Sequence, residues 1–598
     1  GGVMTDTKKN FWNGSEGGAP TGAQGAGLAV ETGSAAGAGA SMSTGTGMSV
    51  SAGADDIKKS FAFEWKWVAS AAVLIGLMVG LAVAVNLNYN HTGDNASNIS
   101  GTINIDNGDL KINWERYPSY NIELSETYTI TESGTYYFTG TLEDGSIIVK
   151  ADAEAVVRIV LNGVTIKNSS GPAIACYSGD DIVIELVGDN YLEDGSKYSA
   201  DLDEDVDGAI YSKSDLSFTG TGSLTIKGNY GDGIVSKDDL TFRSGTYNIT
   251  AVDDAIRGKD SVHITDGDFT IKSTADAIKS TNETDTTKGF ILIENGTFNI
   301  TSSGKGIKAT NSIMIYNGEY NIVSTDDAIH SNNYIGIIDG VINISSGDDG
   351  VHADARLIVD GGTINITKSY EGLEAQKISI NAGKISIVAN DDGINAGGGA
   401  DASSTNRAGA NPFDTDENCE LIINGGEIYV NAAGDGVDSN GYLYFNGGTV
   451  TVDGPTNSGN GALDSGGGIV MNGGTVIAVG ASGMAETLGS SSSVYNISVY
   501  FTSTLSAGTK IEIKNSAGET VISHTSAKAF NHLAAGTSAF KNGETYTIYV
   551  NGSEYQTFTI SSVTTTVGSG GGMQNMMNGG QTNTQTNGQT TTNGAQRR

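Results

Sequence analysis

The chain has 598 residues, of which 33 are basic and 68 acidic, so its formal net charge is −35 at pH 7. Negative charge of this size argues against nucleic acid or an anionic lipid surface as the main partner, because both would be repelled. Exposed carboxylates bind cations more readily. Gly reaches 85 residues while Pro stays at 5, a composition that favours many tight turns between β-strands.

The amino-terminal part of the chain has no core-forming pattern. Residues 1–64 are rich in Gly, Ala, Ser and Thr, and we expect a disordered cytoplasmic segment there. Residues 65–86 include an apolar, uncharged run, 67–85, that is long enough to cross a bilayer as one helix. Residues 87–100 are then expected to form a linker.

The charges beside this run predict its orientation. Three lysines precede it, and the next basic residue is Lys111, so the amino end should stay in the cytoplasm. This predicts a single-pass protein of the cell membrane whose remaining domains are extracellular. A cleaved signal peptide is the alternative, although the run is long for one.

From residue 207 to residue 465 the chain repeats one phrase: a carboxylate, a small residue, an aliphatic, a variable residue, then Ser or Ala. The phrase reads Asp-Asp-Ala-Ile-His-Ser at 326–331 and Asp-Asp-Gly-Val-His-Ala at 348–353. Its aliphatic recurs in steps of 22, 22, 22 and 21 residues, at Ile307, Ile329, Val351, Leu373 and Ile394. A fixed period of this size is typical of a solenoid.

Between two phrases lie two short alternating β-branched runs around Asn-Gly or Gly-Gly, as at 291–301 and 357–367, which predict strand, turn, strand. About 22 residues leave no room for a helical crossover, so the strands must pair in parallel with neighbouring rungs about 4.8 Å away. We therefore predict an all-β fold, a right-handed parallel β-helix of ~22-residue rungs over residues 101–485, preceded by the one transmembrane helix. A leucine-rich repeat has a similar period, but its Leu phrase is absent.

The repeat ends after residue 480. Alternating strands of another kind follow, and residues 494–566 are expected to form a small C-terminal β cap. Residues 567–598 are rich in Gly, Asn, Gln and Thr and should form a disordered tail. Two insertions interrupt the period, near residues 193–205 and 397–418, and loops of this length often line a binding surface.

Several stretches resemble a known family, among them Gly-Thr-Tyr-Tyr-Phe-Thr-Gly-Thr-Leu at 134–142, Val-Leu-Asn-Gly-Val-Thr-Ile at 160–166 and Ala-Val-Asp-Asp-Ala-Ile-Arg-Gly at 251–258. Over residues 100–565 the chain resembles secreted bacterial carbohydrate-binding β-helix proteins, which bind cellulose or polygalacturonate and have a pectate-lyase-like fold. The resemblance implies calcium held in the stack and glycan binding without bond cleavage. The membrane anchor is not part of that family's pattern.

Stacking the phrases aligns two columns of polar residues. The variable residue should point to solvent, and the carboxylates of the turn stack at ~4.8 Å, where neighbours repel by roughly 1 kcal/mol in water and more when partly buried. A Ca²⁺ ion between rungs would offset this repulsion. We expect calcium at Glu371, Glu374, Asp391, Asp392, Asn395, Asp435 and Asp438, with a second candidate cluster at Asp326, Asp327, Asp348 and Asp349. The alternative is that each Asp caps its own turn.

Other members of the variable column are candidate ligand-binding residues. His330 and His352 lie one rung apart on the expected exposed face, where they could contact a glycan hydroxyl or a transition metal. Arg257, Lys279 and Lys308 form a basic column that could grip uronate carboxylates or simply neutralise nearby Asp. For stacking on sugar rings, the exposed aromatic candidates are Tyr370 and Tyr442.

The sequence therefore predicts a cell-surface anchored, calcium-dependent polysaccharide-binding protein for pectin-like or cellulose-like glycans, non-catalytic and monomeric. One alternative is a calcium-dependent pectate-type lyase, with Lys377, Lys308 or Arg257 as its base. Another is an adhesin or stalk that uses the β-helix as a rigid spacer. Release of unsaturated uronate would distinguish the lyase from the binding protein.

Overall fold

The computed structural model describes residues 112–203, 205–397 and 415–569. These residues form strands and turns, with one short 3₁₀ turn at Trp114–Arg116. Among them, no helix is long and apolar enough to cross a membrane. The predicted anchor at 65–86 lies outside the described residues, as do the predicted segments 1–64 and 87–100.

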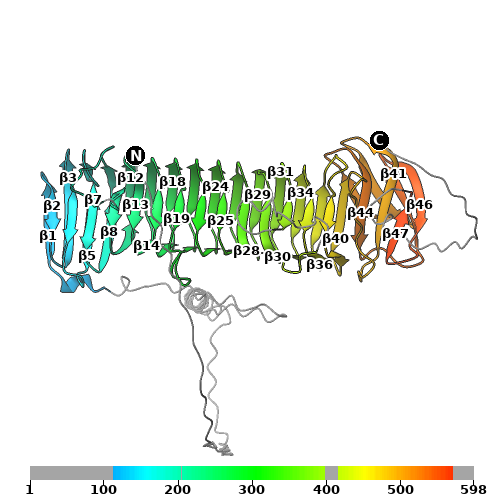
Figure 1. The fold of residues 1–598 in the computed structure, drawn as a ribbon, viewed down its shortest axis with the longest axis horizontal. Helices are drawn as coiled ribbons and strands as arrows, with labels where there is room; N and C mark the ends of the chain where they lie inside the picture. The colour runs from blue at the N-terminus through cyan, green and yellow to red at the C-terminus, as the bar shows by residue number, and fades with distance from the viewer. Residues whose placement is uncertain (1–111, 204, 398–414, 570–598) are drawn as a thin grey trace, which may run out of the picture. The chain divides into compact units, whose positions relative to one another are not determined.

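The described strands form a parallel β-solenoid of about 15 turns, which confirms the predicted class of fold. Each full rung contributes three strands, and every strand pairs in parallel with its counterparts in adjacent rungs, so that the rungs follow one another in chain order (Figure 1). We call the three resulting columns of strands the first, second and third stacks, in their order along a rung.

The first stack carries the repeated phrase. Its strands are β2 (Tyr128–Ile130), β4 (Ile147–Lys150), β7 (Ile174–Ser178), β10 (Gly208–Ser212), β13 (Asp232–Ser236), β16 (Ile256–Gly258), β19 (Ile278–Ser280), β22 (Ile307–Ala309), β25 (Ile329–Ser331), the first parts of β28 (Val351–Val359) and β30 (Leu373–Ile380), β32 (Ile394–Ala396), β35 (Val437–Ser439) and β38 (Leu463–Ser465).

The second stack follows after a short turn. Its strands are β1 (Ser119–Leu124), the first part of β3 (Gly134–Leu142), β5 (Val157–Asn162), β8 (Asp181–Val187), β11 (Asp215–Gly220), β14 (Asp239–Phe242), β17 (Ser261–Ile264), β20 (Phe290–Ile293), β23 (Ser312–Ile315), β26 (Tyr334–Ile337), the second parts of β28 and β30, β33 (Glu420–Ile423), β36 (Tyr442–Phe445) and β39 (Gly468–Met471).

The third stack closes each rung. Its strands are the end of β3, β6 (Thr165–Lys167), β9 (Asp189–Glu193), β12 (Ser223–Gly228), β15 (Thr246–Ala251), β18 (Asp268–Ser273), β21 (Thr297–Ser302), β24 (Glu319–Ser324), β27 (Val341–Ser345), β29 (Thr363–Lys368), β31 (Lys384–Ala389), β34 (Glu427–Ala432), β37 (Thr449–Asp453) and β40 (Thr475–Gly480).

The core lies inside the coil and is built from columns of like residues. The aliphatic of the phrase stacks on itself, as expected: Ile307 pairs in register with Ile329, and Ile329 with Val351, and all three side chains are fully buried. An aromatic column runs beside them, in which the rings of Phe269 and Phe298 stack at 5.0 Å. Because identical side chains repeat at the strand spacing, each rung supplies the packing surface for the next.

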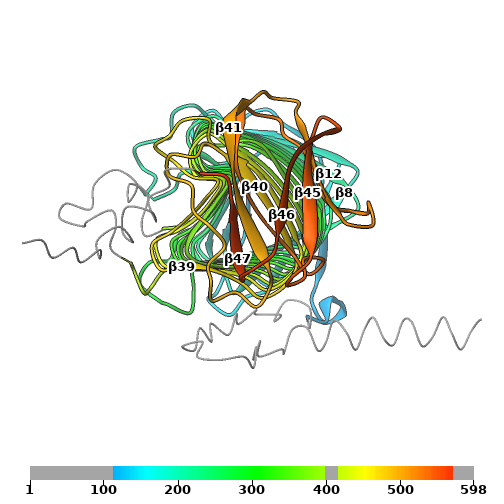
Figure 2. The ribbon, with the colours of Figure 1, turned by 90° about the vertical axis from the view of Figure 1, so that its right-hand side faces the viewer.

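The carboxyl-terminal strands close the open end of the β-helix (Figure 2). They are β41 (Asn496–Leu505), β42 (Lys510–Asn515), β43 (Thr520–Thr525), β44 (Phe530–Thr537), β45 (Thr545–Val550), β46 (Ser553–Thr559) and β47 (Thr564–Val567). Strand β44 pairs antiparallel with β40 and so ends the parallel stack, while β42, β43, β45 and β46 form a separate antiparallel sheet. We call residues 496–567 the cap.

Candidate functional site

The turn carboxylates before the first stack form a ladder of hydrogen bonds between rungs. The Oδ1 atom of Asp232 accepts the backbone N–H of Asp254 at 3.0 Å, and Asp254 accepts that of Asp276 at 2.9 Å. Further along, Asp392 accepts the N–H of Asp435 at 2.5 Å. We call these residues, together with Asp327, Asp349 and Glu371 at the equivalent positions, the carboxylate ladder. Where such a bond forms, one carboxylate oxygen ties two rungs together instead of capping its own turn.

In the early rungs the second oxygen of the ladder carboxylate contacts a basic side chain of the variable column. The Nε atom of Arg257 lies 2.6 Å from Oδ2 of Asp232, and Arg257 also pairs with Asp207. The Nζ atom of Lys279 lies 3.0 Å from Asp254 and 2.9 Å from Asp276. Arg257 and Lys279 therefore both pair with ladder carboxylates. This agrees with the alternative in which the basic column neutralises nearby Asp side chains.

Lys305 occupies a ladder position itself and supplies the next cation. Its Nζ lies 3.0 Å from Oδ1 of Asp326 and 2.5 Å from Oδ2 of Asp327, and the Lys305 side chain is only 5% exposed. On the same Asp327 oxygen, the Nδ1 atom of His330 is at 2.9 Å. The second predicted calcium cluster, which includes Asp326, Asp327, Asp348 and Asp349, therefore already contains a buried ammonium group.

The predicted exposure of the variable column is wrong. His330 and His352 are 3% and 1% exposed, and Tyr211 and Val235 at earlier positions are fully buried. The histidines are covered by their own neighbours, since the Nε2 atom of His330 contacts Asn332 at 3.1 Å and that of His352 lies 3.5 Å from Asp354. Tyr211 and Val235 instead form a small apolar cluster with Val206, Tyr177 and Tyr198, of which Tyr198 belongs to the insertion near 193–205.

His352 is the last base of the column and lies between two acids. Its Nδ1 atom is 3.1 Å from Asp349 and 3.2 Å from Glu374. Burial by itself would lower the pKa of His352, but the hydrogen bond to Asp349 and the charge of Glu374 raise it to about 9. The imidazolium form therefore neutralises this rung at neutral pH. His330 and His352 lie close together, with ring centroids 5.0 Å apart.

Beyond His352 the columns carry acids and one amide. We call this group the acid cluster: Glu371, Glu374, Asp391, Asp392, Asn395, Asp435, Asp438, Asp464 and Glu486. Burial and neighbouring carboxylates raise the pKa of Asp392 to about 7 and that of Asp435 to about 8, and they also raise the pKa values of Glu371, Glu374 and Asp438. Carboxylates forced together in this way need a proton or a cation.

Two geometric details concern the oxygen atoms of the acid cluster. A Cβ placed on Gly434 would clash at 2.3 Å with Oδ1 of both Asp391 and Asp392, so the two oxygens lie close together against the backbone of Gly434. Asn395 donates its Nδ2 to Glu371 at 3.0 Å, while its Oδ1 is buried and has no hydrogen-bond partner among the described residues. An unsatisfied buried amide oxygen is a ready ligand for a hard cation.

The other predicted ligand-binding residues do not gather at one place. Lys308 is half-buried in β22, in register between Lys279 and His330. Tyr370 is 40% exposed in the turn before the first stack, whereas Tyr442 is 38% exposed at the start of β36 in the second stack. These two rings therefore do not form a shared platform.

The place of Lys305 in the turn column follows from the period, but its contacts with Asp326 and Asp327 do not. Sequence reasoning missed Glu486. Glu486 follows the last repeat, so no periodicity pointed to it, yet Asp464 and Asp435 are close enough to help raise its pKa to about 8 after burial.

The chain was compared with known protein families, and a match covers much of the β-helix. Two overlapping segments, residues 125–371 and 306–406, match a family described as carbohydrate-binding domain-containing protein. The family resemblance is confirmed over these segments. They contain the carboxylate ladder from Asp232 to Asp392, while Asp435, Asp438, Asp464 and Glu486 lie beyond them.

One curated relative carries the same description, a carbohydrate-binding domain-containing protein of Acetivibrio thermocellus. It is 31% identical over 164 residues, which are 27% of this chain and 56% of the relative, so the match spans little more than half of that protein's length. A solved structure, the polysaccharide lyase-like protein from C. thermocellum as a gadolinium derivative, is 28% identical and covers 42% of this chain and 96% of its own, with a TM-score of 0.33.

Proposed function

We propose that this chain binds polysaccharide in a calcium-dependent manner and does not cleave it. The family match supports the carbohydrate ligand. The observation that carries the calcium proposal is a change along the two columns of described residues: basic side chains contact the ladder as far as His352, and beyond it the variable column carries Glu374, Asn395, Asp438 and Asp464 with no base among them.

The residues of the acid cluster fit Ca²⁺, which prefers six to eight oxygen ligands from carboxylates and amides. Asp391 and Asp392 offer carboxylate oxygens that lie close together beside Gly434, although Oδ1 of Asp392 also accepts the N–H of Asp435, and Asn395 offers its unpartnered Oδ1. Bound calcium would supply positive charge to acids that otherwise need protons at neutral pH. We do not extend the proposal to the cluster around Asp327, because Lys305 already occupies it.

An acidic polysaccharide such as polygalacturonate is the ligand best suited to a calcium ion held by carboxylates. A chain with a net charge of −35 repels uronate carboxylates unless a cation lies between them. Arg257 and Lys279 are engaged by Asp side chains, so they are less available for this task than a metal ion. Calcium coordinated on one side by the acid cluster could accept uronate oxygens on the other.

The lyase alternative needs a base next to the metal, and the predicted bases lie elsewhere. Lys308 is three rungs from Glu374 in the variable column, which corresponds to about 14 Å at the strand spacing. Arg257 pairs with three carboxylates. Lys377 belongs to the second part of β30, in register with Arg356 and Glu420, and not to the variable column. Binding without cleavage is therefore the better supported function.

The test is retention on immobilised polygalacturonate with Ca²⁺ or with EGTA. We expect retention in calcium, its loss in EGTA, and no release of unsaturated uronate. The double variant Asp392→Asn, Asp435→Asn should lose retention, because each Asn keeps the oxygen that accepts the next rung's N–H but removes the charge. Asp268→Asn, an exposed position on β18, is the matched control. Retention that ignores EGTA would refute calcium dependence, and unsaturated product would refute the non-catalytic assignment.

Display at the cell surface remains a separate proposal. It depends on the apolar run within residues 65–86, which predicts a single-pass anchor with the β-helix outside. Protease added to intact cells should digest or release an epitope placed in the cap and leave one placed before residue 58 intact. Protection of both epitopes would exclude the predicted orientation.

A further inference from the structure

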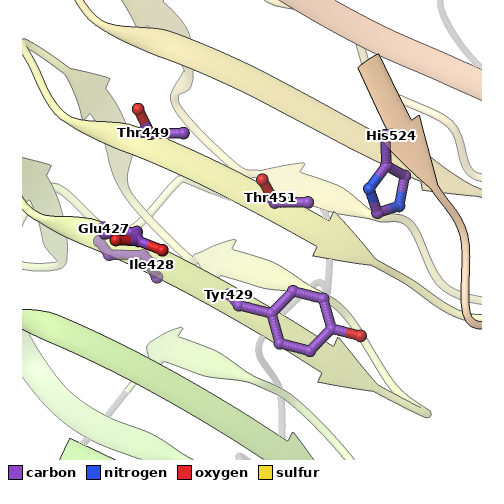
Figure 3. Close-up of a pocket in the computed structure, with 6 residues that line it drawn as sticks. All are labelled: Glu427, Ile428, Tyr429, Thr449, Thr451 and His524. Carbon is purple, nitrogen blue, oxygen red and sulfur yellow. The ribbon is translucent and has the colours of Figure 1, made fainter. Parts of the chain in front are cut away.

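A second polar site lies where the outer face of the third stack meets the cap. Here Glu427 and Tyr429 of β34 and Thr449 and Thr451 of β37 line a hollow of about 480 Å³ that is closed on one side by His524 of β43 (Figure 3). It is an open depression on the sheet and not an enclosed cavity.

The strand alternation places these side chains. Glu427 pairs in register with Thr449 and Tyr429 with Thr451, so two outward pairs stand side by side while the intervening Ile428 is buried in the core. The alternation aims Asp453 outward too, yet it is only 1% exposed because the cap covers it. The cap therefore covers the end of β37 and leaves the start of the strand, with Thr449 and Thr451, uncovered.

Asp453 fixes the walls of the hollow. Its Oδ2 accepts the hydroxyl of Tyr429 at 2.8 Å and the backbone N–H of Ala527 at 3.1 Å, and its Oδ1 lies 2.7 Å from Nε2 of His524. Asp453 thus holds both Tyr429 of the β-helix and His524 of the cap in place. A site whose groups are already positioned loses less entropy when a ligand binds.

The lining defines a chemical class of ligand. Two threonine hydroxyls donate and accept hydrogen bonds, Glu427 accepts them, and the ring of Tyr429 offers an apolar surface. The lining contains no lysine or arginine, and the carboxylate of Glu427 is paired at 3.9 Å with Lys384 of the neighbouring strand β31, so the lining offers no free positive charge to an anionic sugar. Neutral, hydroxyl-rich molecules satisfy such a surface better than uronates, phosphates or apolar ligands.

We infer that this hollow is a subsite for a neutral glycan, which acts independently of calcium. The inference rests on the proposed polysaccharide-binding function and adds a second ligand class at a different place on the β-helix. Since the acid cluster and the hollow use different side chains, chelation should affect the two sites differently.

Calorimetric titration with cellohexaose, xylohexaose and mannohexaose, in EGTA, tests the inference on the full chain. We expect at least one of these sugars to bind, and its affinity to fall about tenfold in the double variant Thr449→Val, Thr451→Val, because the valines keep the shape and β-propensity but remove two hydroxyls. Thr363→Val is the matched control, at the same exposed column position on β29, and should bind like the unaltered chain.

The outcomes separate this inference from the function on which it rests. Binding of no neutral sugar, with retention on polygalacturonate intact, would overturn the subsite alone. Neutral-sugar binding that is equal in the double variant and in Thr363→Val would also overturn it. Failure to bind either class of glycan would overturn the proposed function together with the subsite.

Discussion

Asp327 accepts the backbone N–H of Asp349 on its Oδ1 atom at 2.9 Å, one rung further along the β-helix. Its Oδ2 atom meanwhile lies 2.5 Å from Nζ of Lys305 and 2.9 Å from Nδ1 of His330. One buried side chain therefore sets the contact between two rungs and neutralises two potential cations. The pKa of Asp327 is lowered even though burial opposes this, because His330 and Lys305 stabilise the carboxylate.

Replacing Asp327 should strongly destabilise the β-helix. Asp327→Ala leaves the Lys305 ammonium group buried without its closest partner, and we expect a loss of about 3–5 kcal/mol in the free energy of unfolding of the β-helix. Adding Lys305→Met should recover part of the loss, because the stranded charge disappears. Urea unfolding followed by circular dichroism measures both. Asp268→Ala, on an exposed position, should change stability by less than about 0.5 kcal/mol, and an equally small effect of Asp327→Ala would contradict the ladder.

The acid cluster predicts a pH dependence with a definite sign. The folded pKa values of Asp392, about 7, and Asp435, about 8, lie above the unfolded value near 4, so the metal-free native state binds more protons than the unfolded state between these limits. The contribution of these two carboxyl groups to the stability of the metal-free protein is therefore fully present below about pH 4. It is lost as the pH rises through their folded pKa values of about 7 and 8.

Calcium should reverse this trend, because it replaces the protons. We expect the rise in melting temperature on adding Ca²⁺ to be small at pH 5 and large at pH 8, and scanning calorimetry at both pH values measures it. The double variant Asp392→Asn, Asp435→Asn should show a smaller loss on going to pH 8 in EGTA. A calcium effect that is equal at the two pH values would rule out these carboxylates as the linked groups.

The rungs were predictable because their information is local and repeated. The step from Ile307 to Ile329 to Val351 fixes the period, and the period fixes which side chains stack inside. The calcium candidates Asp392 and Asp435 were found in the same way, since a column of like residues follows from register alone.

The environment of the columns could not be found from the period. His330 and His352 occupy the position expected to face solvent, but Asn332 and Asp354 fold back onto their rings. The hollow beside Thr451 depends on His524, which belongs to the cap and lies 73 positions further along the chain. Contacts of this kind are set by tertiary packing that no repeat encodes.

The aromatic column gives a prediction about packing between rungs. Phe298 is fully buried and stacks on Phe269 at 5.0 Å and on Tyr320 at 4.7 Å. Phe298→Ala should destabilise the β-helix by about 3–5 kcal/mol through the lost apolar area and the cavity, whereas Phe298→Leu should cost less because it refills most of the volume. Denaturant unfolding of both variants measures the difference. Equal losses would mean that the neighbouring rungs collapse into the space.

The junction between β-helix and cap predicts a response to acid. Burial opposes ionisation of Asp453, yet hydrogen bonds from His524 and the backbone of Ala527 lower its pKa below the usual value. Its stabilising contribution is therefore fully present above the unfolded pKa near 4 and is lost as pH falls through the lower folded value. The protection factors of amides in the cap strands, which are exchange rates corrected for the intrinsic effect of pH, should fall over this range in the unaltered chain.

The variant Asp453→Asn isolates that contribution. It keeps the shape but removes the charge that His524 contacts at 2.7 Å, and so we expect low protection factors in β43 already at pH 7, with little further decrease on acidification. Glu554→Gln, an exposed position on β46, should exchange like the unaltered chain at every pH. If Asp453→Asn retained the slow exchange of the unaltered chain at pH 7, then apolar contacts such as that of Val479 with Leu533, and not the buried carboxylate, would hold the cap in place.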